Sequence, residues 1–260
     1  MAYGSMRYGT RSAFRPSWLF VALVGLTIAG GLAAWFGTVN VQLAVIVFVL
    51  AGWMVSLCLH EYGHALLAYR GGDRHVAEAG YLTLNPLKYA HPILSIVLPV
   101  VFLLLGGIGL PGGAVWIDRH AIDSRRRQLW ISLVGPLTNI VFGVLLAIPF
   151  FFLTAAGFLE RPEFWGGVAF LGFLQITAGL LNLAPIPGVD GGNAYRPYLR
   201  TPWDRRFDLF QPYGMLILIV LLFEPRVNAI FFDVVRLLCE LIGMPFDIAM
   251  YGRQLFQFWR

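Results

Sequence analysis

Two histidines and a glutamate lie close together in the stretch LCLHEYGHALLAY, residues 57–69. His60 and His64 are four residues apart, and on an α-helix such residues share one face with their Cβ atoms about 5–6 Å apart. Two imidazoles so placed can bind one zinc ion at about 2.0–2.1 Å. Glu61 lies beside the first histidine, where it can take a proton from a metal-bound water. The spacing therefore predicts a metal site with a general base.

The surroundings of these residues are those of a membrane protein. Of the 260 residues, 58% are hydrophobic and only 13% are charged, whereas soluble domains average about 25% charged residues. The mean hydropathy is +0.71. Ionisable side chains are costly inside a bilayer, so those that occur there usually serve a function. We expect an all-α, multi-pass membrane protein with about six helices, at about 20 residues per crossing.

The apolar runs set the expected organisation of the chain. Those expected to form helices cover residues 18–36, 41–69, 129–158, 164–183, 209–223 and 227–248. A further run near residues 93–117 is broken by prolines and glycines, which favours a re-entrant segment or a β-hairpin buried within the protein. We interpret residues 1–17 as a basic tail. Residues 18–260 then form a single transmembrane domain, with a catalytic core at about residues 42–200.

Arginine placement predicts the orientation in the cell membrane. The net charge is +5, and short basic loops tend to stay on the cytoplasmic side. The tail and the cluster at residues 125–127 should therefore both be cytoplasmic, which requires that the broken run makes no net crossing. Membrane topology explains where the basic residues lie. The sequence has no dense basic patch of the kind that binds nucleic acid.

A catalytic zinc ion needs a third protein ligand, and Asp190 is the best-placed candidate. It follows the helix expected at residues 164–183, which returns to the side where residues 57–69 end. A full crossing by the broken run would instead put Asp190 about 30 Å from His60. Ligand geometry and arginine placement thus require the same topology. The remaining histidines lie in polar loops and are weaker candidates: His75, His91 and His120.

Three segments together resemble the site-2 protease family of zinc intramembrane metalloproteases. They are HEYGH at residues 60–64, GPLTN at 135–139 and NLAPIPGVDGG at 182–192. Their order and spacing agree with the family's HExxH, GPxxN and N-x-x-P-x-P-x-x-D-G motifs, and the resemblance covers about residues 42–200. One departure is His91, which precedes Pro92 where an aspartate is expected, and we assign it no role.

The resemblance implies a role for each matched residue. It implies one zinc ion with three ligands, a catalytic base and a polar group facing the substrate carbonyl: His60, His64 and Asp190 as ligands, Glu61 as the base and Asn182 as the polar group. For Asn139 two alternatives remain open. Its amide either orients the site or only hydrogen-bonds neighbouring helices together.

The implied activity is zinc-dependent endoproteolysis of a transmembrane segment in a membrane-protein substrate, as part of regulated intramembrane proteolysis. The expected partners are the lipid bilayer and the membrane-protein substrate, and nucleic-acid binding is not expected. The sequence does not identify a regulatory partner. Two other classes of function lead to different sequence patterns. A transporter or metal permease would place polar residues at many depths, and a catalytically silent binding partner would usually lack a ligand or the base.

Overall fold

The computed structural model describes residues 14–38, 40–89, 98–106, 115–257 and 259. Every regular element in these ranges is helical, as the sequence predicts, and no strand occurs among them. Four long helices form the bundle that carries the site: α1 (Trp18–Phe36), α2 (Val41–Gly71), α5 (Arg125–Ala147) and α7 (Pro162–Asn182).

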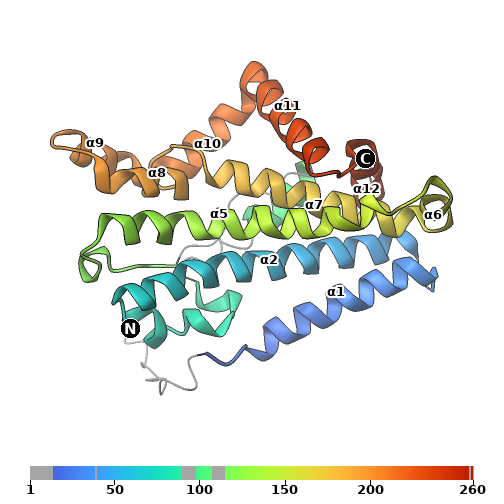
Figure 1. Cartoon of the computed structure of the whole chain (residues 1–260), viewed down its shortest axis with the longest axis horizontal. Helices are drawn as coiled ribbons and strands as arrows, with labels where there is room; N and C mark the ends of the chain where they lie inside the picture. The colour runs from blue at the N-terminus through green and yellow to red at the C-terminus, as the bar shows by residue number, and fades with distance from the viewer. Residues whose placement is uncertain (1–13, 39, 90–97, 107–114, 258, 260) are drawn as a thin grey trace.

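Helix α2 is the centre of this bundle, and α1, α5 and α7 all pack against it (Figure 1). Polar caps fix where three of the helices begin. The side chains of Ser17, Asn40 and Ser124 accept hydrogen bonds from backbone N–H groups in the first turns of α1, α2 and α5, which satisfies donors left free at a helix start. Apolar side chains from α2 and α7 dominate the core between the helices.

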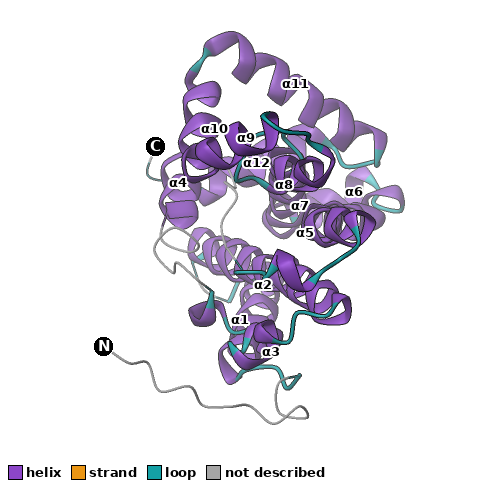
Figure 2. Cartoon of the chain, turned by 90° about the vertical axis from the view of Figure 1, so that its left-hand side faces the viewer, coloured by secondary structure: helices purple, strands orange, loops and turns teal. Residues whose placement is uncertain are grey.

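Shorter helices lie around the four long ones (Figure 2). They are α3 (His75–Glu78), α4 (Leu98–Gly106), α6 (Ala155–Glu160), α8 (Asp190–Tyr195), α9 (Trp203–Phe210), α10 (Gly214–Phe223), α11 (Pro225–Leu241) and α12 (Phe246–Phe256). Single 3₁₀ turns lie at Tyr81–Thr83, Pro86–Lys88, Arg119–Ala121, Ile148–Phe151, Arg196–Tyr198 and Gln211–Tyr213. Helices α10 and α11 form an angled pair above α7 in Figure 1.

Five helical stretches in the described residues are long and apolar enough to cross a membrane, so the chain is a membrane protein. They are Trp18–Phe36, Val41–Gly71, Arg125–Phe151, Pro162–Asn182 and Trp203–Phe223. The predicted count of about six is not confirmed. The run expected at residues 227–248 divides at Gly243 into α11 and α12. Helix α11 has only 17 residues and carries charges on an exposed face, including an ion pair between Arg236 and Glu240.

The broken run makes no net crossing. Its described parts are residues 115–117 and α4, whose nine residues extend about 14 Å, well short of a hydrocarbon core of about 30 Å. Ile122 and Ile131, at the start of α5, pack with Ala65 and Ala68 near the end of α2. Helix α5 therefore begins where α2 ends, as the sequence predicts. Residues 93–97 and 107–114 lie outside the described part, so the choice between a re-entrant segment and a β-hairpin stays a prediction.

Close packing of α1 on α2 depends on Gly30. A Cβ atom at this position would lie 2.7 Å from the backbone nitrogen of Phe48 and 3.2 Å from the carbonyl oxygen of Ala44. Gly25 lies on the same helix, and a Cβ atom there meets nothing within 4 Å. The two glycines thus form a matched pair, one in the helix interface and one outside it.

We expect Gly30→Leu to destabilise the protein and Gly25→Leu to leave its stability nearly unchanged. A side chain at position 30 must push α1 away from α2, and overpacking of this kind costs about 1–3 kcal/mol. The midpoint of thermal unfolding of the detergent-solubilised protein measures the effect. Equal midpoints for the two variants would contradict the packing described here.

Candidate metal centre

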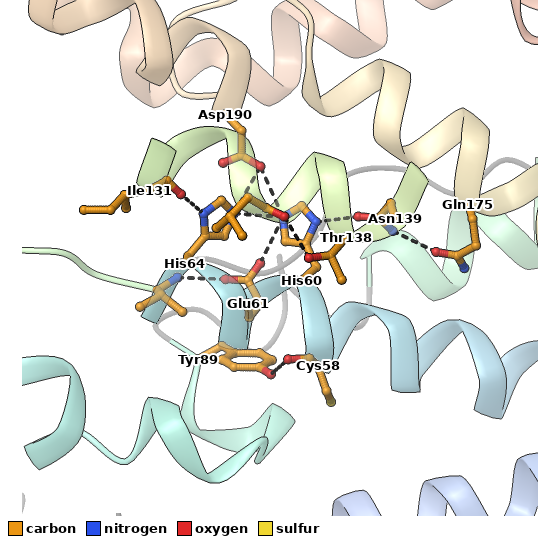
Figure 3. A network of polar contacts seen from close by, with 12 residues as sticks. Cys58, His60, Glu61, His64, Tyr89, Ile131, Thr138, Asn139, Gln175 and Asp190 are labelled. Carbon is orange, nitrogen blue, oxygen red and sulfur yellow. Dashed lines mark hydrogen bonds and ion pairs between the residues drawn. The ribbon is translucent and has the colours of Figure 1, made fainter. Parts of the chain in front are cut away.

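The candidate ligands of the metal centre come from two helices (Figure 3). Helix α2 contributes His60 and His64, which project from the same face one turn apart, and Asp190 is the first residue of α8. The Nε2 atoms of the two histidines are 3.0 Å apart. Oδ2 of Asp190 lies 3.1 Å from Nε2 of His60 and 3.3 Å from Nε2 of His64. The structure thus brings together the three ligands expected from the sequence.

The other ring nitrogen of each histidine identifies its tautomer. Nδ1 of His64 lies 2.5 Å from the carbonyl oxygen of Ile131, and Nδ1 of His60 lies 2.5 Å from Oδ1 of Asn139. Both oxygens can only accept a hydrogen bond, so each Nδ1 carries the proton. In the neutral form of each ring, Nε2 is then unprotonated and its lone pair faces Oδ2 of Asp190.

In that form three electron-pair donors face one another. Oδ2 of Asp190 is buried without a hydrogen-bond partner, an arrangement that a bound cation would stabilise. Tetrahedral zinc with ligands at about 2.0–2.2 Å has ligand–ligand distances of about 3.3 Å, close to the three distances observed. Two imidazoles and one carboxylate also form a typical catalytic zinc set with one position left for water. The residues present fit one zinc ion.

Glu61 is held beside this cluster by a loop from another part of the chain. Its side chain is only 2% exposed. Oε2 accepts a hydrogen bond of 3.2 Å from the backbone N–H of Val115, while Oε1 lies 3.9 Å from Nε2 of His60. One carboxylate oxygen is thus fixed by the loop, and the other faces the metal ligands, where it can exchange a proton with a water molecule.

Asp73 anchors the loop that holds Glu61. This buried carboxylate accepts hydrogen bonds from the backbone N–H groups of Asp118, at 2.8 Å, and of His75, at 2.9 Å. No sequence pattern singled out Asp73, which follows two glycines and resembles an ordinary turn residue. Its complete burial was the feature that the local pattern did not reveal.

A cavity of about 480 Å³ opens onto the ligands and Glu61. Asn182, at the end of α7, is 7% exposed, lines this cavity and has no hydrogen-bond partner in the described part of the chain. His120 also lines the cavity but is not part of the ligand cluster. His75 packs edge-on against Trp116, with ring centroids 5.2 Å apart. His91 lies outside the described residues.

Asn139 connects three helices through a chain of amide hydrogen bonds. Its oxygen accepts from His60 on α2, and its Nδ2 donates to Oε1 of Gln175 on α7 at 2.8 Å. Asn139 therefore contacts a candidate metal ligand and also bonds α5 to α7, and its role in orienting the site stays a prediction. Gln175 is completely buried and was missed by the sequence analysis. A lone amide in an otherwise apolar membrane helix was the available signal.

Gly135 lets α5 approach the metal ligands. A Cβ atom at this position would overlap with Nε2 of both His60 and His64. These two atoms must stay where they are to face Asp190, so no side chain fits at position 135. The contact gives a physical reason for the glycine in the GPLTN segment.

Replacing Gly135 with alanine should abolish zinc binding. The added methyl group displaces both imidazoles, whereas Gly25→Ala adds a methyl group to α1 in open space and serves as the matched control. Zinc per protein, measured by atomic emission on purified material, is expected to fall to near zero only in Gly135→Ala. A full zinc complement in that variant would disprove the proposed ligand geometry.

Replacing Gln175 with leucine should weaken zinc binding by about 10–100-fold, the usual effect of losing an outer partner of a ligating histidine. The Asn139 amide then loses the acceptor that fixes its orientation, and Gln175→Glu should restore affinity because it keeps an acceptor. Thr177→Val is the control, since the buried Thr177 hydroxyl bonds only within its own helix, to Phe173. Competition with a fluorescent zinc chelator measures affinity. Equal affinities in the leucine and valine variants would rule out this role.

Comparison with known proteins agrees with the geometry. The chain is 44% identical over 254 residues to a protein of Mycolicibacterium smegmatis and 46% identical over 258 residues to one of Mycobacterium tuberculosis, both named "Putative zinc metalloprotease Rip2". These matches cover 96% of this chain and 96–97% of each relative. A protein of Bacillus subtilis named "Putative zinc metalloprotease YwhC" is 28% identical over 179 residues, 66% of this chain and 78% of that protein.

No family model matches the chain, and no solved structure was found to match it. The relatives share nearly its whole length, and their names agree with a site whose ligands and base fit one zinc ion. The chain belongs to the site-2 protease family of zinc metalloproteases.

Proposed function

We propose that this protein is an intramembrane endopeptidase that cleaves a transmembrane segment of another membrane protein, as a step in regulated proteolysis. The observation that carries the proposal is the position of the site on α2. This helix has 31 residues, about 46 Å in length, and is apolar enough to span a bilayer. His60 lies 11 residues before its end at Gly71, about 16 Å along the axis, which is within the hydrocarbon depth.

Each residue of the site has one role in the proposed reaction. His60, His64 and Asp190 hold the zinc ion, which when bound lowers the pKa of a coordinated water to about 7 and polarises a carbonyl. Glu61 takes the proton from the attacking water through Oε1 while Val115 holds Oε2. Glu61 then delivers that proton to the nitrogen of the leaving amine.

Asn182 is proposed to donate a hydrogen bond from its side-chain amide to the oxygen of the scissile carbonyl. Its location on the cavity wall and its lack of other partners support this role. A donor already placed where negative charge develops lowers the barrier without reorganising during the reaction. Asn139 and Gln175 are proposed to act through His60, by keeping its tautomer and ring orientation.

The substrate must expose its backbone to be cut. A helix hides its carbonyls in internal hydrogen bonds, so the segment has to unwind locally before it reaches the cavity. The broken run near residues 93–117 is proposed to pair with the unwound segment by strand addition. The described residues 115–117, which line the cavity and have no regular secondary structure, are consistent with this role.

We also propose that the site opens toward the cytoplasm in the cell membrane. Arginines lie in the last turn of α2 and in the first turn of α5, and further arginines follow α7: Arg70, Arg125–Arg127, Arg196 and Arg200. These positions all belong to the end of the bundle that carries the site, which the positive-inside rule assigns to the cytoplasm. Water and substrate flanks can then reach the cavity from that side.

Replacing Glu61 with glutamine should reduce cleavage of a transmembrane substrate by about 10²–10⁴-fold, the usual contribution of a general base. Zinc content should stay at one per protein, because Glu61 is not a ligand. Glu78→Gln, which alters an exposed acid on α3, is the control for loss of charge. Cleavage products are measured by mass spectrometry with the protein in lipid vesicles, and unchanged cleavage by Glu61→Gln would refute the mechanism.

A further inference from the structure

Arg119 lies in the cavity wall opposite the helix that carries the third zinc ligand. It begins the 3₁₀ turn Arg119–Ala121 and lines the same cavity as Asp190. Its Nη1 atom donates a long hydrogen bond of 3.4 Å to the carbonyl oxygen of Asn193. Asn193 is one turn after Asp190 on α8, so the guanidinium group reaches from the loop to the edge of the metal site.

The charge of Arg119 has no acidic partner in the described residues. A guanidinium group has five N–H donors, and within the described part of the chain this one makes a single hydrogen bond. Nearby Arg196 differs, because Asp208 accepts two hydrogen bonds of 2.6 Å from it. Arg119 therefore keeps both its positive charge and several donors available to the cavity.

The surroundings of Arg119 disfavour a cation that stays unpaired. Burial lowers the pKa of Arg119, the positive charge of Arg196 lowers it further, and the acids Asp190 and Asp208 offset only part of this effect. Asp208 is already engaged by Arg196, and Asp190 faces the two histidines. An anion that enters the cavity would supply the missing partner, and a carboxylate matches the paired donors of a guanidinium group.

We infer that Arg119 forms a carboxylate-binding subsite that selects substrates carrying an acidic group on the cytoplasmic side of the scissile bond. The inference rests on the proposed proteolytic function and names the chemical class of its substrates. The carboxylate has two sources, the side chain of an Asp or Glu at the membrane boundary or the free C-terminus of a fragment already trimmed. A carboxylate at the boundary avoids the cost of burying charge in hydrocarbon.

Binding of synthetic peptides tests the subsite without turnover. The zinc-loaded protein carrying Glu61→Gln is placed in nanodiscs of neutral lipid. Fluorescent peptides share one apolar run of about 20 residues and differ only in the flank that follows it. One set carries a single Glu at successive flank positions, a second carries Gln instead, both with an amidated C-terminus. A third carries Gln and a free C-terminal carboxylate.

We expect at least one carboxylate peptide to bind about tenfold more tightly than its Gln counterpart, as for one charge-assisted pair. Adding Arg119→Gln should reduce that ratio to within about twofold, and Arg119→Lys should retain part of it because the charge remains. Arg126→Gln, an exposed arginine at the start of α5, should change nothing. Zinc content confirms that each variant keeps its site, and the peptide set that shows the preference identifies the source of the carboxylate.

Two results would overturn the inference. One is equal binding of carboxylate and amide peptides by the Glu61→Gln protein, and the other is a preference that persists in Arg119→Gln. A failure of the underlying function is distinguishable from either. If the protein with Glu61 intact cleaves the neutral peptide but shows no preference, only the subsite is wrong. If no peptide is bound or cleaved, the proposed function fails and the subsite fails with it.

Discussion

The mutual repulsion of three electron-pair donors in an apolar interior is the constraint on which the rest of the structure depends. Two imidazole nitrogens and a carboxylate oxygen lie within 3.3 Å of one another, and an unpaired buried charge costs several kcal/mol. A bound cation stabilises such an arrangement. The features that hold these groups in place are therefore best understood as supports for a metal ion.

These supports come from separate parts of the chain. Helix α5 provides the two acceptors that fix the histidine tautomers, Ile131 and Asn139, and Gly135 allows it to approach closely enough to do so. Helix α7 provides Gln175 and leads into the turn that delivers Asp190. The loop anchored by Asp73 holds the base. Zinc binding and bundle packing are consequently coupled, since a shift of any one helix moves either a ligand or the partner of a ligand.

The sequence predicted the parts of this site that have a local signature. Two histidines one helical turn apart in an apolar run indicated a metal site, and charge placement indicated a topology that brings Asp190 to the same end of the bundle. Gln175 and Asp73 escaped prediction because their partners, Asn139 and Asp118, are distant in the chain. Such contacts depend on how helices and loops pack, which no short pattern encodes. The all-α fold could be predicted from the length of the apolar runs, but the number of membrane-spanning helices could not. Apolar length predicts helices well, whereas Gly243 and the charges of α11 decided that residues 227–248 do not form one span.

Zinc K-edge X-ray absorption spectroscopy on the purified protein tests the central claim most directly, because it reports the atoms bound to the metal. The three proposed ligands, His60, His64 and Asp190, predict a shell of nitrogen and oxygen atoms at about 2.0–2.2 Å, with the outer-shell signal of two imidazole rings. In the Asp190→Ala variant, the spectrum of any zinc that remains bound should still show scattering from two imidazole rings. The scattering from the carboxylate should be lost. A sulfur shell at about 2.3 Å, or a spectrum without imidazole scattering, would contradict the account.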